Sequence, residues 1–218
     1  MKVSQIYKKY KVMPSLQLHM YRVTAVASRI VDNWKGENLD KKEIIIACLL
    51  HDIGNIIKFK LGYIPEALEP EGLDYWEAVK KEFIEKYGKD EHEATHKIAR
   101  EIEVSERIFE IISAIGFSKS VENTRESDFR KKISCYSDHR VTPGGIASLE
   151  KRMQSGRKRF EVNKGISDLK KAGADFEMYA KGMRKLEKQI FQKCSIKPED
   201  IADESVAPYL EKMKEVEI

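Results

Sequence analysis

The residues of this sequence best suited to chemistry are His51 and Asp52, which stand side by side after an apolar run. The run spans Ile44–Leu50, and a segment that is apolar on every side belongs in a protein core. An imidazole and a carboxylate are good ligands for a divalent cation, and a buried lone carboxylate is costly unless a charge or a metal compensates it. The pair therefore indicates a metal site. The simpler alternative is a histidine at a helix C-terminus beside a solvated aspartate.

Two more candidate ligands lie elsewhere in the chain. His19 falls beside the apolar stripe of a predicted helix, where a core histidine is the ordinary alternative, and Asp138 stands at the C-terminal end of another predicted helix. With His51 and Asp52 they make a set of two nitrogen and two oxygen ligands, which suits Mn, Fe, Co, Ni or Mg better than structural zinc. Such an ion would leave positions open for water and for a substrate oxygen.

Two further features have plainer alternatives. His92 and His96 are one helical turn apart and could share a metal, but their segment is so charged that we favour a solvated helix face. A basic run follows at residues 151–159. Its cations would suit RNA if they neutralised phosphates, and a solvated helix face is again the interpretation that we favour.

The spacing of apolar residues predicts helices throughout and no strand. Pro14 opens a helix that carries His19, Asp40 caps the helix that carries His51, and Gly54 is the expected C-terminal cap of that helix. Later helices are expected to begin at or near Asp74, Asp90, Ser105, Phe129, Leu149, Phe176 and Asp203.

Two segments are predicted to be loops. Residues 55–73 contain two glycines and two prolines and should hold at most one short helix. Because this segment begins beside the His-Asp pair, it is the expected rim of the substrate site. Residues 117–127 are polar and are predicted to connect two helices.

Composition indicates a helical protein of one domain, or of one domain with an appended helical piece. The chain has 218 residues, is 35% charged, and carries a net charge of +4, which argues against a strongly cationic nucleic-acid-binding protein. No apolar run reaches the roughly 18–20 residues of a membrane span, and the N-terminus lacks the core of a signal peptide. Three widely spaced cysteines fit a reducing compartment. We expect a cytoplasmic, all-α protein with a core at 1–145 and C-terminal helices at 146–218 that pack on or extend it.

The order of the candidate ligands resembles the HD-domain metal-dependent phosphohydrolases. The residues that carry the resemblance are His19 with Arg22 on the first long helix, LLHDIG at Leu49–Gly54, and Asp138 in YSDHRVTP. The order and separation of these residues are a more specific signal of the family than the short motif HDIG alone. The resemblance covers roughly residues 14–145 and implies a bundle of helices around a metal site.

By this resemblance the metal ligands are His19, His51, Asp52 and Asp138, and the activity is hydrolysis of a phosphate mono- or diester, often of a nucleotide. A water molecule bound to the metal would attack the phosphorus atom, and Asp52 would orient that water molecule. His92 or His96 is a candidate general acid, since histidine titrates near neutral pH.

The chain departs from the family pattern directly after HDIG. Many relatives carry lysine there, and some nucleotide monophosphatases use an acidic residue near that position, whereas this chain has Asn55, which cannot titrate. Positive charge for the substrate phosphate would come instead from Arg22, Lys58, Lys60 or Arg140, with Asn55 beside them in the substrate site.

A second departure concerns the number of metal ions. Binuclear relatives add two histidines between HD and the last aspartate, and one of these could match His92 or His96. The other would fall near Ser113–Phe117, where no ligand stands. We therefore expect one divalent ion.

The sequence thus predicts a metal-dependent phosphohydrolase that acts on a nucleotide or another small phosphate ester. A membrane partner is not expected and nucleic acid is disfavoured, while a homodimer is left open. The first alternative is a non-hydrolytic sensor of the same fold that binds metal and nucleotide but releases no phosphate. The second is an RNA-associated protein that uses residues 151–159.

Overall fold

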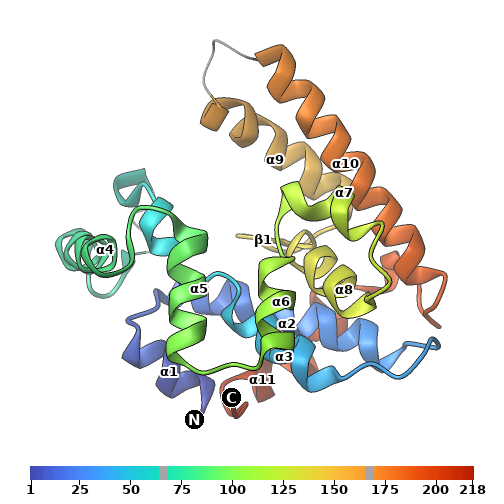
Figure 1. Cartoon of the computed structure of the whole chain (residues 1–218), viewed down its shortest axis with the longest axis horizontal. Helices are drawn as coiled ribbons and strands as arrows, with labels where there is room; N and C mark the ends of the chain where they lie inside the picture. The colour runs from blue at the N-terminus through green and yellow to red at the C-terminus, as the bar shows by residue number, and fades with distance from the viewer. Residues whose placement is uncertain (64–67, 165–168) are drawn as a thin grey trace.

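The protein is a bundle of helices, as a computed structural model of the chain shows (Figure 1). The structure describes residues 1–63, 68–164 and 169–218, and among them the side chains of all but 158–164 and 169–172. The α-helices of the described residues are α1 Val3–Lys9, α2 Pro14–Asp32, α3 Lys41–Leu50, α4 Leu73–Tyr87, α5 Glu91–Glu101, α6 Glu106–Ser113, α7 Ser120–Asn123, α8 Phe129–Asp138, α9 Leu149–Lys164, α10 Leu169–Phe191 and α11 Asp203–Met213. The predicted all-α class is confirmed.

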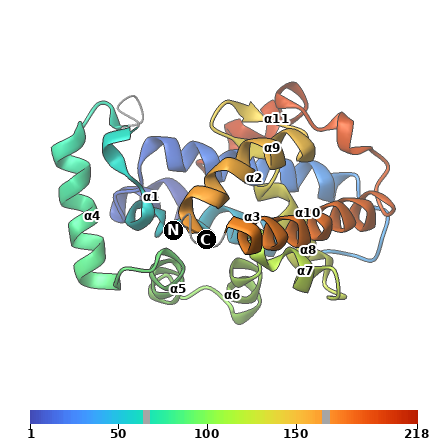
Figure 2. The same cartoon turned by 90° about the horizontal axis from the view of Figure 1, so that it is seen from above.

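Helices α2 and α3 form the centre of the bundle, between α4 at one end and α10 at the other (Figures 1 and 2). Two hydrophobic clusters meet on them. The first cluster joins them to α1, α4, α5 and α6, and the second joins them to α8, α9 and α10. In α3, Leu50 belongs to the first cluster and Ile44 to the second. Helix α3 is therefore apolar all round because it is covered on both sides.

Several helix starts follow from local capping. The Asp40 carboxylate accepts hydrogen bonds from the amides of the first turn of α3, and Asp90 and Ser105 cap α5 and α6 in the same way. These starts confirm the sequence prediction. Helix α4 differs, because it begins at Leu73 after Gly72 rather than at Asp74.

The two predicted loops contain short helices. Residues 55–73 include the 3-10 helices η1 Asn55–Lys58 and η2 Leu61–Tyr63, and residues 64–67 of this segment lie outside the described residues. Residues 117–127 include the 3-10 helix η4 Phe117–Lys119 and α7. The Ser120 hydroxyl donates to the carbonyl of Tyr179 in α10, at 2.9 Å. Tertiary contact with α10 thus organises a segment that polarity alone predicts to be a loop.

The chain also contains elements that the sequence did not predict. Helix α1 buries Val3, Ile6 and Tyr7 against the first cluster. After α8 the TPGG turn joins two antiparallel strands of two residues each, β1 Val141–Thr142 and β2 Gly145–Ile146. This hairpin leads into α9, so it lies across the boundary expected between residues 145 and 146. Helix α11 packs against α2, and the amino group of Met1 donates to the carbonyl of Ile218 at 2.8 Å.

Gly54 has a different function from the predicted helix cap. Helix α3 ends earlier, with His51 as its C-cap, and Gly54 has an ordinary φ of −89°. A Cβ atom at Gly54 would lie 2.7 Å from both the carbonyl oxygen of Glu91 and the amide nitrogen of Thr95. The glycine is needed because the turn after α3 touches the backbone of α5.

We expect Gly54→Ala to lower the free energy of unfolding by about 1–3 kcal/mol, since backbone atoms of α5 would have to move. Urea denaturation of wild type and variant measures the change. Gly62→Ala is the control, because no atom lies within 4 Å of its Cβ position. Equal stability of wild type and Gly54→Ala would contradict the packing argument.

Candidate metal centre

Four predicted ligands meet where α2, α3 and α8 pack against one another. His19 lies in α2, His51 and Asp52 follow α3, and Asp138 is the last residue of α8. Nε2 of His19 is 3.1 Å from Oδ1 of Asp138 and 3.5 Å from Oδ2 of Asp52. Nε2 of His51 is 3.6 Å from an oxygen of each of the same carboxylates. The structure therefore brings residues from three helices to one point.

The ligand atoms of His19, His51 and Asp138 all lie within 4.8 Å of one another. Atoms that share one ion at about 2.1 Å are separated by roughly 3–4 Å, so this spacing suits a single cation. Asp52 adjoins the group through its contacts with both histidines. Two imidazoles and two carboxylates are a set of ligands that binds divalent transition metals or magnesium.

His51 provides the strongest sign that the cluster fits a cation. Its Nδ1–H donates to the carbonyl of Cys48 at 2.8 Å, which leaves Nε2 as the nitrogen that can bind a metal. Nε2 is fully buried and has no hydrogen-bond partner among the described residues. Because a buried polar atom without a partner is costly, its position facing two carboxylates fits a metal ligand.

The centre is open to solvent on one side. The side chain of His51 is 2% exposed, whereas those of His19, Asp52 and Asp138 are 23%, 21% and 16% exposed. A ligand bound from solvent would therefore meet both carboxylates and His19, with His51 behind them.

The ionisable groups of the cluster change one another's pKa values. Burial opposes the charged form of each acid, yet the pKa of Asp138 is held well below its usual range by His139, His19 and His51. The pKa of Asp52 is also lowered, against the effect of burial, by His51, Lys58 and His19. Burial likewise opposes a charge on His51, but the two carboxylates raise its pKa to about 9. The cluster thus holds anionic carboxylates next to a protonated His51.

A divalent ion should displace a proton from His51 when it binds. Because the pKa of His51 is raised to about 9, the imidazole is protonated at pH 7 without metal, and Nε2 must lose its proton to become a ligand. We expect the apparent metal affinity to rise by up to about tenfold per pH unit from pH 7 to pH 9. Isothermal titration calorimetry with Mn²⁺ in buffers of different ionisation enthalpy measures the released protons. Binding enthalpies that are independent of the buffer would contradict this prediction.

Two predicted phosphate-binding cations lie near the centre. Nζ of Lys58 is 3.6 Å from Oε1 of Glu91, and its charge contributes to the lowered pKa of Asp52. Arg22 lies one turn after His19 in α2 and donates to the carbonyl of Pro143 in the hairpin turn, at 3.3 Å. Both side chains keep contact with solvent, so a substrate could reach them.

Two other residues predicted to bind the substrate, Asn55 and Arg140, are buried in the structure. Asn55 starts η1, and its side chain is 3% exposed. Arg140 is 2% exposed, and its guanidinium donates to the carbonyls of Ala147, Pro198 and Ile201 and to the hydroxyl of Tyr136. Arg140 therefore ties the hairpin and the segment before α11 to α8.

The two histidines of α5 stay apart from the cluster. His92 is exposed, and its Nε2 is 3.8 Å from Oε1 of Glu91. Nε2 of His96 lies 3.1 Å from the hydroxyl of Ser113 in α6, and burial lowers the pKa of His96. The two side chains therefore have different neighbours, and neither contacts a cluster ligand among the described residues.

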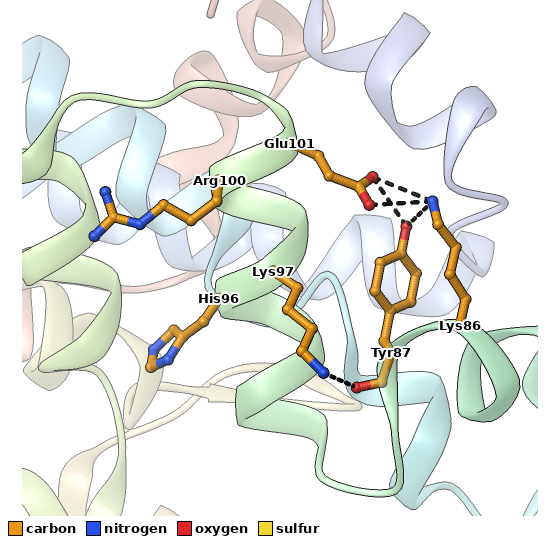
Figure 3. A pocket seen from close by; sticks show the side chains of 6 residues that line it. All are labelled: Lys86, Tyr87, His96, Lys97, Arg100 and Glu101. Atoms are coloured by element: carbon orange, nitrogen blue, oxygen red, sulfur yellow. Dashed lines mark hydrogen bonds and ion pairs between the residues drawn. The ribbon is translucent and has the colours of Figure 1, made fainter.

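His96 lines a separate pocket between α4 and α5 (Figure 3). The other lining residues are Lys86, Tyr87, Lys97, Arg100 and Glu101. Lys86 is bound to Glu101 and Lys97 donates to the carbonyl of Tyr87, as the dashed lines show. Arg100 is paired with Glu106. The cations of this pocket are already neutralised or hydrogen-bonded, and the pocket contains no residue of the metal centre.

Two neighbours of the centre were not predicted. His139 follows Asp138, and its Nδ1 lies 3.5 Å from Oδ2 of that residue while it donates to the carbonyl of Cys135 at 3.0 Å. Its ring stacks on Phe117, with the ring centres 5.5 Å apart. Glu91 reaches the centre through Lys58. Sequence adjacency could have indicated His139, whereas the position of Glu91 depends on how α5 packs.

The fold is almost entirely helical, and its cluster of histidines and aspartates could hold a divalent cation. The family model of the HD domain matches residues 17–142, more than half of the chain, and contains all four predicted ligands. The chain belongs to the HD-domain family. Members of this family bind divalent metals and are typically metal-dependent phosphohydrolases. Comparison with curated proteins and with solved structures gives no significant match.

No helix formed by the described residues combines the length and the apolar character needed to cross a bilayer.

Proposed function

We propose that this protein is a metal-dependent phosphohydrolase that hydrolyses a nucleotide or another small phosphate ester. The observation that carries the proposal is the buried Nε2 of His51, which has no hydrogen-bond partner among the described residues and faces Asp52, Asp138 and His19. Membership of the HD-domain family supports the same class of activity.

A divalent ion bound by His19, His51, Asp52 and Asp138 would lower the pKa of a water molecule and offset the charge of a phosphate. The carboxylate of Asp52 is anionic, so it can accept a hydrogen bond from that water and orient it. Lys58, whose charge acts on Asp52, and Arg22, one turn after His19 in α2, are the cations that would bind phosphate oxygens. We give no role to His92, His96 or Arg140, because of the positions described above.

We propose one ion per chain. A second ion next to the first would need ligands of its own to offset the repulsion between the charges. His96 is hydrogen-bonded to Ser113, at the place where the sequence offers no further imidazole. Elemental analysis of dialysed protein gives the stoichiometry, and two tightly held ions would show that the assignment is wrong.

A sensor that binds a nucleotide without hydrolysing it is the second candidate. The observation that favours it is Asn55, an amide that cannot donate or accept a proton at the position where some relatives have an acid. Such a protein would bind a nucleotide together with the metal and would release no phosphate.

The test is a screen of the purified protein against phosphate mono- and diesters with Mn²⁺, Co²⁺, Ni²⁺, Mg²⁺ and Fe²⁺, in which released phosphate is measured. We expect turnover of at least one nucleotide or small ester, and loss of that turnover with a chelator. Nucleotide binding without turnover in any metal would favour the sensor. If the protein neither binds nor hydrolyses any of these compounds, both candidate functions are wrong.

A further inference from the structure

Lys132 is a buried cation that lies away from the metal centre. It is the fourth residue of α8 and is 4% exposed. Its ammonium group donates to Oε1 of Gln189 in α10 at 2.9 Å, and the amide group of Gln189 is oriented by its own hydrogen bond to the carbonyl of Thr124. An ammonium group has three N–H donors. Among the described residues, Lys132 has this one hydrogen-bond acceptor and no carboxylate partner.

Two further lysines lie beside Lys132. Its Nζ atom is 4.6 Å from the centre of the Phe129 ring, and Nζ of Lys193, which follows α10, is 5.2 Å from the same ring centre. Lys185 precedes Gln189 by four residues in α10, so these two side chains lie on one face of that helix, one turn apart. The packing of α8 against α10 therefore brings three cations together from two segments of the chain.

The nearby acids leave these lysines with an excess of positive charge. Asp128 is bound to Arg130, and Glu187 is hydrogen-bonded to a tyrosine of α8. Glu126 attracts the charge of Lys132, yet burial and the two neighbouring lysines together lower the pKa of Lys132. A buried cation beside like charges is a costly arrangement unless an anion supplies the opposite charge.

A phosphate group is the anion that suits three ammonium groups best. Its charge at neutral pH is about −1.5 to −2, and its oxygens accept hydrogen bonds from several directions. Lysine binds phosphate as a compact charge on a flexible stem, whereas the planar fork of arginine is the better match for a carboxylate. The lysines gather at one aromatic ring instead of forming a row, so they suit a single phosphate group better than the backbone of a nucleic acid.

We propose that Lys132, Lys185 and Lys193 form a site, separate from the metal centre, that binds the phosphate group of a small molecule. Lys132 and Asp138 are six residues apart in α8, which corresponds to about 9 Å along the helix axis and to different sides of the helix. Lys132 contacts α10, whereas Asp138 faces His19 and the metal centre. The inference does not depend on the proposed function, because it concerns a different face of α8.

The test measures the binding of inorganic phosphate to the full-length protein by isothermal titration calorimetry in the presence of a chelator. Without metal, the carboxylates of the metal centre repel phosphate, so that binding reports on the lysines. Lys132→Met keeps an apolar stem of similar length and removes the charge. Lys8→Met is the matched control, because it removes the same charge from an exposed position of α1. We expect phosphate to bind about 10- to 100-fold more weakly to Lys132→Met, about 2- to 5-fold more weakly to Lys185→Met and Lys193→Met, and equally to Lys8→Met.

Melting temperatures separate phosphate binding from folding. Phosphate should raise the melting temperature of wild type and of Lys8→Met but not that of Lys132→Met, which in phosphate-free buffer should be as stable as wild type because it lacks an unpaired buried charge. If Lys132 only supports the contact between α8 and α10, Lys132→Met should melt at a lower temperature in phosphate-free buffer, and Lys185→Met and Lys193→Met should bind phosphate like wild type. That result, an equal loss of affinity in Lys8→Met, or no phosphate binding by wild type would each overturn the inference. If Lys132→Met does not fold, the two exposed variants decide the question.

Two further ligands distinguish the source of the phosphate group. Adenosine monophosphate and a short single-stranded RNA are titrated into the same metal-free proteins. Tighter binding of adenosine monophosphate than of inorganic phosphate, with the same dependence on Lys132, identifies an esterified phosphate as the ligand, and the reverse order identifies the free anion. Both results support the inference. If the RNA binds more tightly than either, displaces phosphate and loses affinity steeply with salt, the lysines form a nucleic-acid surface and the inference is wrong.

Discussion

Replacing Asp52 or Asp138 by alanine should abolish phosphate release, with a loss of at least about 100-fold in turnover. The estimate is a lower bound, because removing a residue that merely supports a metal ligand already costs about 10- to 100-fold. Both carboxylates lie within 3.6 Å of the imidazole nitrogens of His19 and His51, so each loss removes a ligand and a charge. Released phosphate and bound metal are measured for each variant at matched metal concentration.

The fold should survive both substitutions. Removing one partner of a buried ion pair costs about 3–5 kcal/mol, and we expect the lower end of this range because both carboxylates retain some contact with solvent. Circular dichroism checks that helix content is kept. His92→Ala is the control, since this histidine is exposed and contacts no cluster ligand among the described residues; its neighbour is Glu91. Wild-type turnover in either aspartate variant would show that the catalytic assignment is wrong.

Replacing Arg140 by methionine should destabilise the protein by about 3–5 kcal/mol. Arg140 is 2% exposed and donates to four oxygen atoms, three of which belong to backbone carbonyls outside α8. Methionine cannot donate to them, so these buried acceptors would lose their partners. Urea denaturation gives the change in the free energy of unfolding.

Arg184→Met is the matched control for Arg140. Arg184 is also paired, through both carboxylate oxygens of Glu150, but the pair lies at the surface. A surface pair contributes no more than about 1 kcal/mol, so this variant should be nearly as stable as wild type. If Arg140→Met keeps wild-type stability and instead raises KM for a phosphate ester, the substrate-binding role predicted from the sequence is correct.

The sequence by itself determined most of the longer helices and the residue types of the site. The ends of α3, α5 and α6 depend on side chains within a turn of the cap, so Asp40, Asp90 and Ser105 could be recognised locally. The uninterrupted apolar run before His51 showed that α3 is central, because only a helix covered on both sides is apolar all round. The order of the two histidines and two aspartates then indicated the family.

Other features depended on contacts between segments that are distant in the sequence. Gly54 was expected to cap a helix, and its actual constraint is the backbone of α5 at 2.7 Å from its Cβ position. Residues 120–123 were expected in a loop, but α10 supplies the partner that makes a helix favourable there. A local pattern contains no information about such partners.

The tertiary structure also decided the surroundings of each charged residue. Arg140 and Lys58 are equally cationic in the sequence, yet Arg140 is buried among carbonyl groups and Lys58 lies near Asp52. Likewise, His96 turns towards Ser113 while His19 reaches two carboxylates. The reason is physical: the chemistry of a charged side chain depends on its burial and on its neighbours, and both are fixed only when the helices pack.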